Sequence, residues 1–223
     1  MKEFNWADEP QSTAYPIAKA GYPFIFSAAF TTMVLALAGW NLLALVGLLV
    51  TGFICFFFRD PDRVIPVDEK GIVSPADGKV IIAEVVEKND FIPGPCMKIS
   101  IFMSVFNVHV NRVPYPGVVE EIRYFPGKFF NASLDKASKD NESNALIVKT
   151  EDNVDYAFVQ IAGLVARRII CGVTEGNSVR KGARFGLICF GSRLDVYVPE
   201  NTRLAVSVGD KVQAGTSILG YME

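Results

Sequence analysis

The stretch LICFGSRLDVYVP, residues 187–199, contains a serine directly after a glycine. Because Gly191 has no Cβ, the carbonyl group on the amino side of Ser192 is open to attack. A serine hydroxyl becomes a nucleophile when a base removes its proton, and a carboxylate commonly orients that base. With a histidine and an aspartate nearby, Ser192 could therefore convert the Gly191–Ser192 amide bond into an ester.

His109 is the candidate base, since the chain has a single histidine. It lies in VFNVHVNRVP, where strand alternation places Asn107, His109 and Asn111 on one face. A half-exposed strand histidine without a chemical role would give the same pattern. Asp77, in VSPADGKV, is first of all a turn residue between two β-rich runs. A rigid turn could also hold its carboxylate against an imidazole.

Basic residues accompany these groups. Arg112, three residues after His109, could bind a phosphate or a carboxylate, or it could simply cover a sheet edge. A second group of basic residues could attract an anionic membrane surface, or could be an ordinary solvated cluster. Its members are Arg167, Arg168, Arg180, Lys181, Arg184 and Arg193.

The elements around Gly191 are expected to be two strands joined by a tight turn. Residues 187–190 form one apolar run, and residues 194–198 alternate towards Pro199. From Val67 onward, similar short β-rich runs are separated by turn signals, which predicts a compact, mainly β domain. The polar segment 128–144 is expected to be a surface loop, either a lid over a site or a disordered connector.

A weak internal repeat refines the fold class. EGNSVRKGARFG and VGDKVQAGTSIL share the pattern Gly-x-x-Val-x-x-Gly. Glycines suit turns that need a positive φ, so we expect two equivalent hairpin corners with the valines, Val179 and Val212, pointing inward. The pattern resembles the β-sandwich called a barrel-sandwich hybrid, which is also found in biotin and lipoyl carrier domains. Lys211 lies within such a corner, so we expect a solvated turn lysine there and not a swinging arm.

An apolar region precedes this domain. Residues 23–58 contain no charged side chain. A single helix of that length would be about 54 Å long, whereas a hydrocarbon core is about 30 Å thick. We therefore expect a transmembrane helical hairpin over residues 22–58 that turns at Gly39, after an N-terminal segment 1–21 and before a β-rich domain 59–223. Lys19, Arg59 and Arg63 flank the hairpin, which favours both ends in the cytoplasm. A hairpin that dips into one leaflet and a buried hairpin in a soluble protein are the alternatives.

Composition excludes other classes. The formal net charge of −2 offers no general attraction to nucleic acid. The four cysteines are scattered without a CxxC pair, so neither a zinc site nor a disulfide framework is expected.

Five blocks in order resemble a known family: FFFRDPDRVIP, VSPADGKV, NVHVNRVPYPG, QIAGLVARRIICGV and FGSRLDVYVP. Together they are similar to the short bacterial and archaeal form of phosphatidylserine decarboxylase, a pyruvoyl-dependent enzyme. The resemblance runs from the apolar region to the C-terminus. It implies a proenzyme that cuts itself between Gly191 and Ser192, giving a β chain of residues 1–191 and an α chain of residues 192–223.

The resemblance also implies roles for the three candidate residues. Asp77 would orient His109, His109 would deprotonate Ser192, and Ser192 would become a covalently bound pyruvoyl group. That group would form a Schiff base with the substrate amine and serve as an electron sink during decarboxylation. The products would be CO₂ and phosphatidylethanolamine, a step of phospholipid biosynthesis. Arg112 and Arg193 would be candidates for the substrate phosphate or carboxylate, and no metal is implied.

One departure from the long form of the family concerns the histidine block. Long-form members have His-x-x-His before a proline, and here the set is His109-x-x-Arg112. Either His109 serves both cleavage and decarboxylation, or Arg112 has changed the arrangement.

The expected location is the cell membrane, with the catalytic domain on the cytoplasmic side and phosphatidylserine as the partner. Assembly with further copies of the chain is left open. Two other functions stay open at this point: decarboxylation of archaetidylserine, and a membrane-anchored barrel-sandwich adaptor without catalysis.

Overall fold

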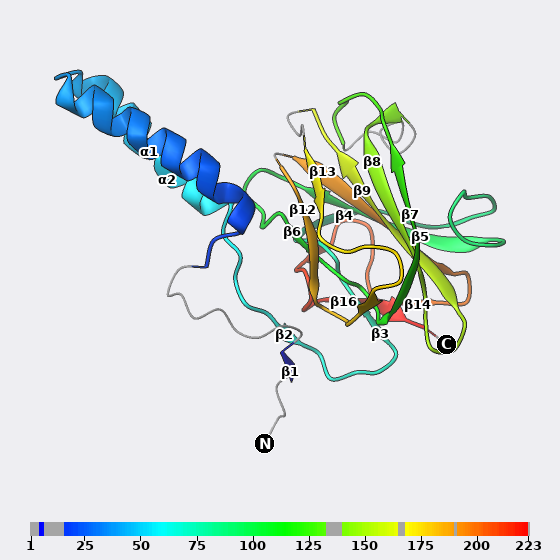
Figure 1. Ribbon diagram of the computed structural model, residues 1–223. Coiled ribbons are helices and arrows are strands. Elements are labelled where there is room, and N and C mark those ends of the chain that lie inside the picture. Colours follow the sequence, from blue (N-terminus) through cyan, green and yellow to red (C-terminus); the bar gives the residue numbers. More distant parts are fainter. Residues whose placement is uncertain (1–4, 7–15, 133–139, 165–167, 190, 223) are drawn as a thin grey trace. The chain divides into compact units, whose positions relative to one another are not determined.

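Figure 1 shows a computed structural model that describes residues 5–6, 16–132, 140–164, 168–189 and 191–222. The chain divides into two compact units, one of residues 11–62 and one of residues 1–10 with 63–223, and each is described by itself. The fold is mainly β, with 40% of the described residues in strands and 19% in helices, as the sequence predicts.

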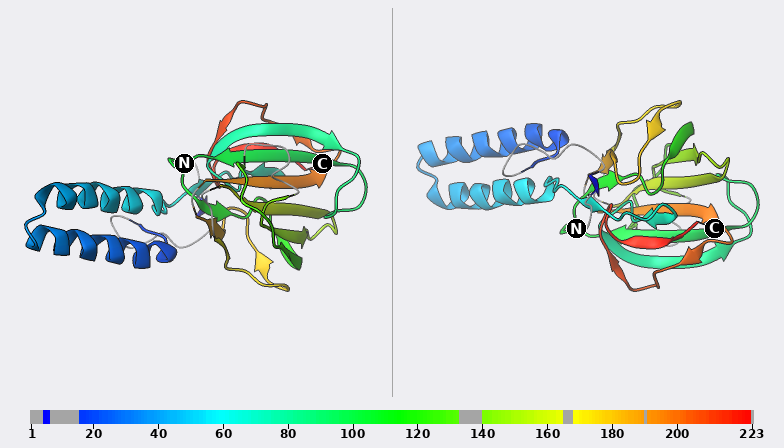
Figure 2. Two further views of the ribbon diagram at one scale, coloured as in Figure 1. Left: turned by 90° about the horizontal axis from the view of Figure 1, so that it is seen from above. Right: turned by 90° about the horizontal axis from the view of Figure 1, so that it is seen from below.

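The smaller unit is a pair of apolar helices. A 3₁₀ turn, η1 (Lys19–Gly21), leads into α1 (Tyr22–Leu37), and α2 (Asn41–Phe57) follows a turn at Gly39, whose φ is 77°. The helices run side by side in both views of Figure 2, and the hydroxyl groups of Thr32 and Thr51 lie 3.4 Å apart between them. Two adjacent helices therefore occupy the region where the hairpin is predicted.

The helix pair has the surface of a membrane segment. No residue of α1 is buried, although its side chains are almost all apolar. The helical stretch Lys19–Leu37 is long and apolar enough to cross a membrane, and α2 is somewhat shorter. This exposure favours association with a membrane over a buried core hairpin.

The larger unit contains all the strands. They are β1 (Asn5–Trp6), β2 (Val64–Ile65), β3 (Gly71–Val73), β4 (Gly78–Val86), β5 (Cys96–Met103), β6 (Val110–Arg112), β7 (Gly117–Phe125), β8 (Ser143–Lys149), β9 (Asp155–Ala162), β10 (Ile169–Cys171), β11 (Ser178–Val179), β12 (Arg184–Ile188), β13 (Ser192–Pro199), β14 (Arg203–Leu204), β15 (Lys211–Val212) and β16 (Ile218–Tyr221).

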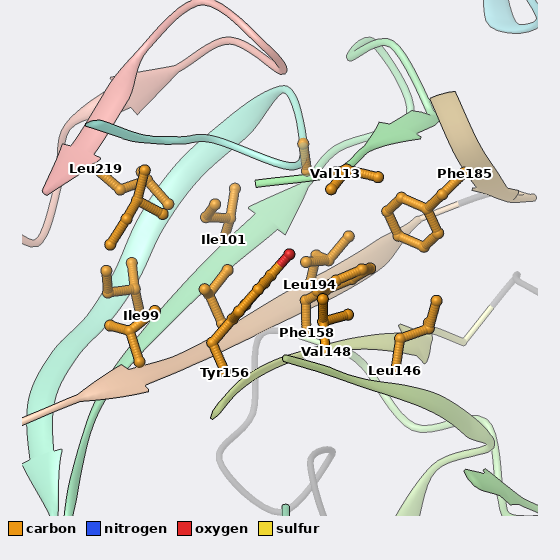
Figure 3. Packing of buried hydrophobic residues seen from close by; sticks show 14 of the residues in the cluster. Ile99, Ile101, Val113, Leu146, Val148, Tyr156, Phe158, Phe185, Leu194 and Leu219 are labelled. Carbon is orange, nitrogen blue, oxygen red and sulfur yellow. The ribbon is translucent and has the colours of Figure 1, made fainter. Parts of the chain in front are cut away.

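An eight-stranded antiparallel sheet organises this unit, in the order β11-β7-β8-β9-β13-β5-β4-β15. Smaller sheets, β10-β12-β6 and β14-β16-β3, accompany it. Alternate residues of the central strands face one large apolar core, where Ile101, Phe158 and Leu194 converge (Figure 3). A smaller apolar cluster that includes Val159 and Tyr197 covers the other face. Burial on both faces explains why these strands read as nearly continuous apolar runs.

The two corners of the internal repeat lie at the two edges of this sheet. Val179 in β11 pairs beside β7, and Val212 in β15 pairs beside β4. Both valines are buried in the main core. The prediction of two equivalent corners is confirmed, because all four glycines of the repeat have a positive φ: Gly176, Gly182, Gly209 and Gly215.

The predicted hairpin at residues 187–199 is wrong. β12 and β13 do not pair with each other: β12 pairs with β10 and β6, whereas β13 pairs with β9 and β5. Both edges of β13 are thus occupied by strands that are distant in sequence, and the chain passes from one sheet to another between Ile188 and Ser192. Phe190 lies outside the described residues.

Candidate active site

Ser192 is the first residue of β13, where two neighbouring strands enclose it. Its Cα partners in register are Met103 at the end of β5 and Ala162 at the end of β9. The residue is 0% exposed, and its Oγ donates a hydrogen bond to Met103 Sδ at 3.3 Å. Gly191, immediately before it, has a φ of 67°, a conformation that favours glycine. The Gly191–Ser192 peptide bond therefore joins a glycine in the left-handed backbone conformation to a buried central strand.

Gly163 approaches this bond more closely than any side chain would allow. A Cβ at Gly163 would lie 2.2 Å from the carbonyl oxygen of Gly191 and 3.0 Å from its carbonyl carbon. It would also lie 3.3 Å from the Cβ of the buried Ala132. The absence of a side chain at position 163 is thus required for the present position of the Gly191 carbonyl group. The sequence pattern gave no indication of this residue, because the contact depends on the register of β9 against β13.

His109 lies just before β6 and is 0% exposed, so the alternative of a half-exposed strand histidine is wrong. Its Nδ1 is 2.9 Å from the carbonyl oxygen of Asn107. The backbone N–H of Ile188 donates to the carbonyl oxygen of His109 at 3.4 Å. Ile188 also packs against Ala162, the register partner of Ser192. The backbone of the chain's only histidine is therefore linked through Ile188 and Ala162 to Ser192.

Asp77 has other partners than the histidine. Its carboxylate accepts hydrogen bonds from Arg63 Nη2 at 2.8 and 3.2 Å and from the Ala214 N–H at 2.7 Å. The turn that carries Asp77 nevertheless contacts the histidine segment, since the Arg112 N–H donates to the Pro75 carbonyl at 2.9 Å. The structure thus brings the two segments together, but the Asp77 carboxylate accepts its hydrogen bonds from Arg63 and Ala214 and not from His109.

The two candidate anion-binding arginines are both buried. Arg112 Nη1 donates to the Gly182 carbonyl at 2.8 Å. Arg193 is fully enclosed, with Nε 2.5 Å from Asp195 Oδ1 and Nη2 2.8 Å from Ser100 Oγ. Arg193 therefore does not belong to an exposed basic cluster.

Other members of that cluster differ in exposure. Arg168 and Arg180 are exposed, and Arg167 lies outside the described residues. Lys181 donates to the carbonyl groups of Asp68 and Gly71. Burial lowers the pKa of Lys181, and the attraction of Asp68 and Glu69 only partly opposes this. The basic cluster is thus not one continuous face.

A buried chain of polar side chains leads to Ser192. Gln160 Nε2 donates to Asn111 Oδ1 at 3.0 Å, and Asn111 Nδ2 lies 3.8 Å from Met103 Sδ, which in turn accepts from Ser192 Oγ. On the far side, Asn144 Nδ2 donates to Gln160 Oε1 at 3.3 Å. Buried amides are held in place when each is hydrogen-bonded, so this chain fixes the surroundings of the serine. Sequence alternation placed Asn111 beside His109 but gave no signal for Gln160 or Asn144.

A pocket of about 590 Å³ is lined in part by Asp77, Ser104 and Asn107. Ser104 directly follows Met103, and its N–H and Oγ both donate to Asn107 Oδ1, at 2.9 and 2.8 Å. One turn therefore connects Met103, which contacts Ser192, with Asn107, which contacts His109. A small polar ligand in the pocket would lie against this turn.

The segment 128–144 is anchored beside the same bond. Asn141 is buried and donates to the carbonyl groups of Phe130 at 2.8 Å and Ala162 at 2.7 Å. Residues 133–139, on which the lid prediction mainly rests, lie outside the described residues. Among the residues that are described, no group of three or more His, Cys, Asp and Glu side chains could hold a metal ion.

These observations define a mainly β protein in which a Gly–Ser bond is held at the start of a central strand, with a buried histidine whose backbone is linked to that strand through two residues. Comparison with known families agrees with the sequence blocks. The family model described as phosphatidylserine decarboxylase matches residues 50–220. The chain belongs to the phosphatidylserine decarboxylase family.

Several curated relatives cover nearly the whole chain. A phosphatidylserine decarboxylase proenzyme of Desulfotalea psychrophila is 50% identical over 93% of this chain and 97% of its own length. The proenzyme of Syntrophus aciditrophicus is 51% identical over 92% of this chain and 96% of its own length. The proenzyme of Geotalea uraniireducens is 51% identical over 93% of this chain and 97% of its own length. The similarity therefore extends through both units, and these relatives are named as proenzymes.

Proposed function

We propose that the chain cuts itself between Gly191 and Ser192 and then decarboxylates phosphatidylserine to phosphatidylethanolamine. The observation that carries the proposal is the buried Ser192 next to a positive-φ glycine in a family of proenzymes. Family membership favours an enzyme over a membrane-anchored adaptor.

The proposed cut proceeds through an ester. Ser192 Oγ attacks the carbonyl carbon of Gly191, the C–N bond breaks, and the amide becomes an ester. Loss of the Ser192 Cα proton then breaks the Cβ–Oγ bond, which leaves Gly191 as a carboxylate and residue 192 as a dehydroalanine. Water replaces the nitrogen of this residue as ammonia leaves, and a pyruvoyl group remains. The enclosed position of Ser192 between β5 and β9 suits such a group, since few waters can compete with the attack.

The pyruvoyl group supplies a ketone that takes up the electrons left by departing CO₂. The other steps belong to protein groups. We propose that His109 accepts the Ser192 proton during cleavage and returns a proton to the substrate carbon after decarboxylation. Asp77 acts through the turn that it ties to Arg63 and Ala214, because its carboxylate already has these partners.

The arginines divide between two roles in this proposal. Arg112 is on the strand that follows His109, so it stays a candidate for the substrate carboxylate. For Arg193 we favour a structural role, because it is fully buried against Asp195. Removing one member of a buried pair leaves an uncompensated charge, which commonly costs about 3–5 kcal/mol.

The helical hairpin gives the enzyme access to its lipid. We propose a location at the cell membrane with the larger unit on the cytoplasmic side. Lys19 precedes α1, and Arg59 and Arg63 follow α2, which is the charge distribution expected when both ends of a hairpin are cytoplasmic.

The test is the mass of the purified chain together with its activity. The wild type is expected to yield two fragments, residues 1–191 and residues 192–223, the second with a blocked N-terminus. The same preparation is expected to release CO₂ from phosphatidylserine in vesicles. Active preparations that contain only the uncut chain of 223 residues would rule out the pyruvoyl proposal.

His109→Ala separates the two proposed uses of the histidine. We expect the variant to remain uncut, because Ser192 then lacks its base, as judged by the intact mass after prolonged incubation. Normal cutting with loss of decarboxylation would instead restrict His109 to the second reaction. The change also opens a cavity at a buried position, so thermal unfolding should be compared with that of uncut Ser192→Ala.

A further inference from the structure

Two loops beside the Gly191–Ser192 bond expose large apolar side chains. The chain leaves β5 after Met103 and leaves β9 after Ala162, and both residues are register partners of Ser192. Phe106, in the first of these loops, and Leu164, in the second, are each 67% exposed. β5 and β9 flank β13, so the two loops emerge about 10 Å apart.

The exposed apolar row continues along the same end of the sheet. Tyr124 and Phe125 at the end of β7 are 58% and 40% exposed. Phe125 pairs with Ser143 at the start of β8, which in turn pairs with Ile161 near the end of β9. Every other exposed large apolar residue in the described part of 63–223 is a valine. The aromatic and leucine side chains are thus confined to the end of the sheet that holds Ser192.

The Phe106 loop is a well-defined turn. The Asn107 N–H donates to the Ser104 carbonyl at 2.9 Å, and Asn107 Oδ1 accepts from both the N–H and the Oγ of Ser104. Phe106 therefore projects from a fixed support, and little conformational entropy is lost when the side chain enters an apolar medium.

Positive charge adjoins this row. Lys79 on β4 and Lys211 on β15 lie directly opposite each other, and both are exposed. Like charges in such a pair are unfavourable. Neither lysine has an acidic partner among the residues that the structure describes. Lys79 is also the register partner of Phe102, the residue before Met103, so the pair borders the same end of the sheet.

Other described charges at this end have both signs. Lys128 and Arg168 are exposed there, and Asp140 and Glu142 lie at the foot of the segment 128–144. Asp210 precedes Lys211, so the lysine pair adds more positive charge than this one carboxylate offsets among the described residues.

We propose that this end of the β-sheet docks onto an anionic lipid surface, with Phe106 and Leu164 inserted among the acyl chains and the Lys79–Lys211 pair against lipid phosphates or carboxylates. Large apolar side chains flanked by lysines are the arrangement that interfacial binding uses, and each exposed charge adds attraction to an anionic leaflet. The choice of phosphatidylserine as the anionic lipid rests on the proposed function; the docking face itself does not.

Insertion depth provides a test that needs no enzyme activity. In a Trp6→Phe, Trp40→Phe background, a single tryptophan is introduced as Phe106→Trp, Leu164→Trp or Val118→Trp. Each full chain is reconstituted in phosphatidylcholine–phosphatidylserine vesicles with brominated acyl chains. We expect quenching at positions 106 and 164 and none at 118, where the native valine is 45% exposed and lies at the opposite end of β7 from Phe125. Equal quenching at the three positions, or shielding of 106 and 164 without lipid by a second copy of the chain, would overturn the proposal.

Kinetics provide the second arm. Phe106→Ser combined with Leu164→Ser is expected to raise the KM for phosphatidylserine in vesicles at least about tenfold, since most of the apolar insertion is lost. Self-cutting and turnover of a short-chain, water-soluble phosphatidylserine should not change. Val118→Ser is the matched control for loss of an exposed apolar side chain at the other end of the sheet. An unchanged KM in vesicles would count against docking, whereas a wild type without any decarboxylation would count against the proposed function and leave the quenching result standing.

The lysine pair is tested by salt. Wild-type KM on phosphatidylserine vesicles is expected to rise with ionic strength, and Lys79→Gln with Lys211→Gln should show a higher KM at low salt and a flatter salt dependence. Identical salt dependence in the two proteins would remove the lysines from the docking surface.

Discussion

Ser192→Ala is expected to leave a single uncut chain without detectable decarboxylase activity. The substitution removes only Oγ, the atom that would attack the Gly191 carbonyl, and this atom's single described hydrogen bond is the one to Met103 Sδ. Little of the packing around β13 should therefore change, and thermal unfolding should stay close to that of an uncut wild-type precursor. Intact mass reports the cut, and CO₂ release from phosphatidylserine reports the activity.

Ser207→Ala is the matched control, because this serine is exposed and lies outside the layer around Gly191. It should be cut and active like the wild type. A Ser192→Ala protein that still separates into residues 1–191 and 192–223 on a denaturing gel would show that another group carries out the cleavage.

Gly163→Ala is expected to slow self-cutting by about a hundredfold, although the substituted residue is neither nucleophile nor base. The added Cβ would meet the carbonyl oxygen of Gly191 at 2.2 Å, and backbone on both sides cannot move aside as a flexible side chain could. Either the Gly191 carbonyl or β9 must shift, and a displacement of about 1 Å at a reacting group commonly costs about a hundredfold in rate. The time course of precursor conversion, followed by gel, measures this effect.

Gly172→Ala is the control for the loss of a glycine near a backbone oxygen. A Cβ at position 172 would lie 3.4 Å from the Phe185 carbonyl oxygen, which is ordinary contact, so normal cutting is expected. Conversion of Gly163→Ala at the wild-type rate would show that the Gly191 carbonyl can be placed without this close approach. Far-UV circular dichroism should match that of Ser192→Ala, so that slow cutting is not mistaken for misfolding.

Local patterns predicted the elements but not how the strands pair around Gly191. The uncharged stretch from Pro23 to Phe58 and the turn at Gly39 were sufficient for the helical hairpin, because helix length and membrane thickness are fixed quantities. The repeat centred on Val179 and Val212 was sufficient for the two corners, because glycine at positive φ is a local requirement. The pairing of β13 with β5 and β9 is not local, and no feature of residues 187–199 excludes a hairpin there.

The same distinction applies to the candidate site. Ser192 and His109 could be chosen by their chemistry alone. Gly163 could not, since its role arises from the register of β9, and glycines commonly follow strands simply because the chain turns there. The partners of Asp77 could not be predicted from the sequence either. Arg63 precedes Asp77 by 14 residues and Ala214 follows it by 137, so no local pattern links the three.

The position of β13 in the middle of the sheet has a consequence for the cut protein. In the proposed cut form, the short chain would contribute β13, which pairs with β5 and β9 of the long chain. That form would be a heterodimer held without a covalent link, and its stability would depend on protein concentration in a way that the precursor's does not. Once denatured and diluted, the two chains must meet again before the central strand can be restored. Under this proposal, the central strand pairs most readily before the cut, while both halves are still one chain.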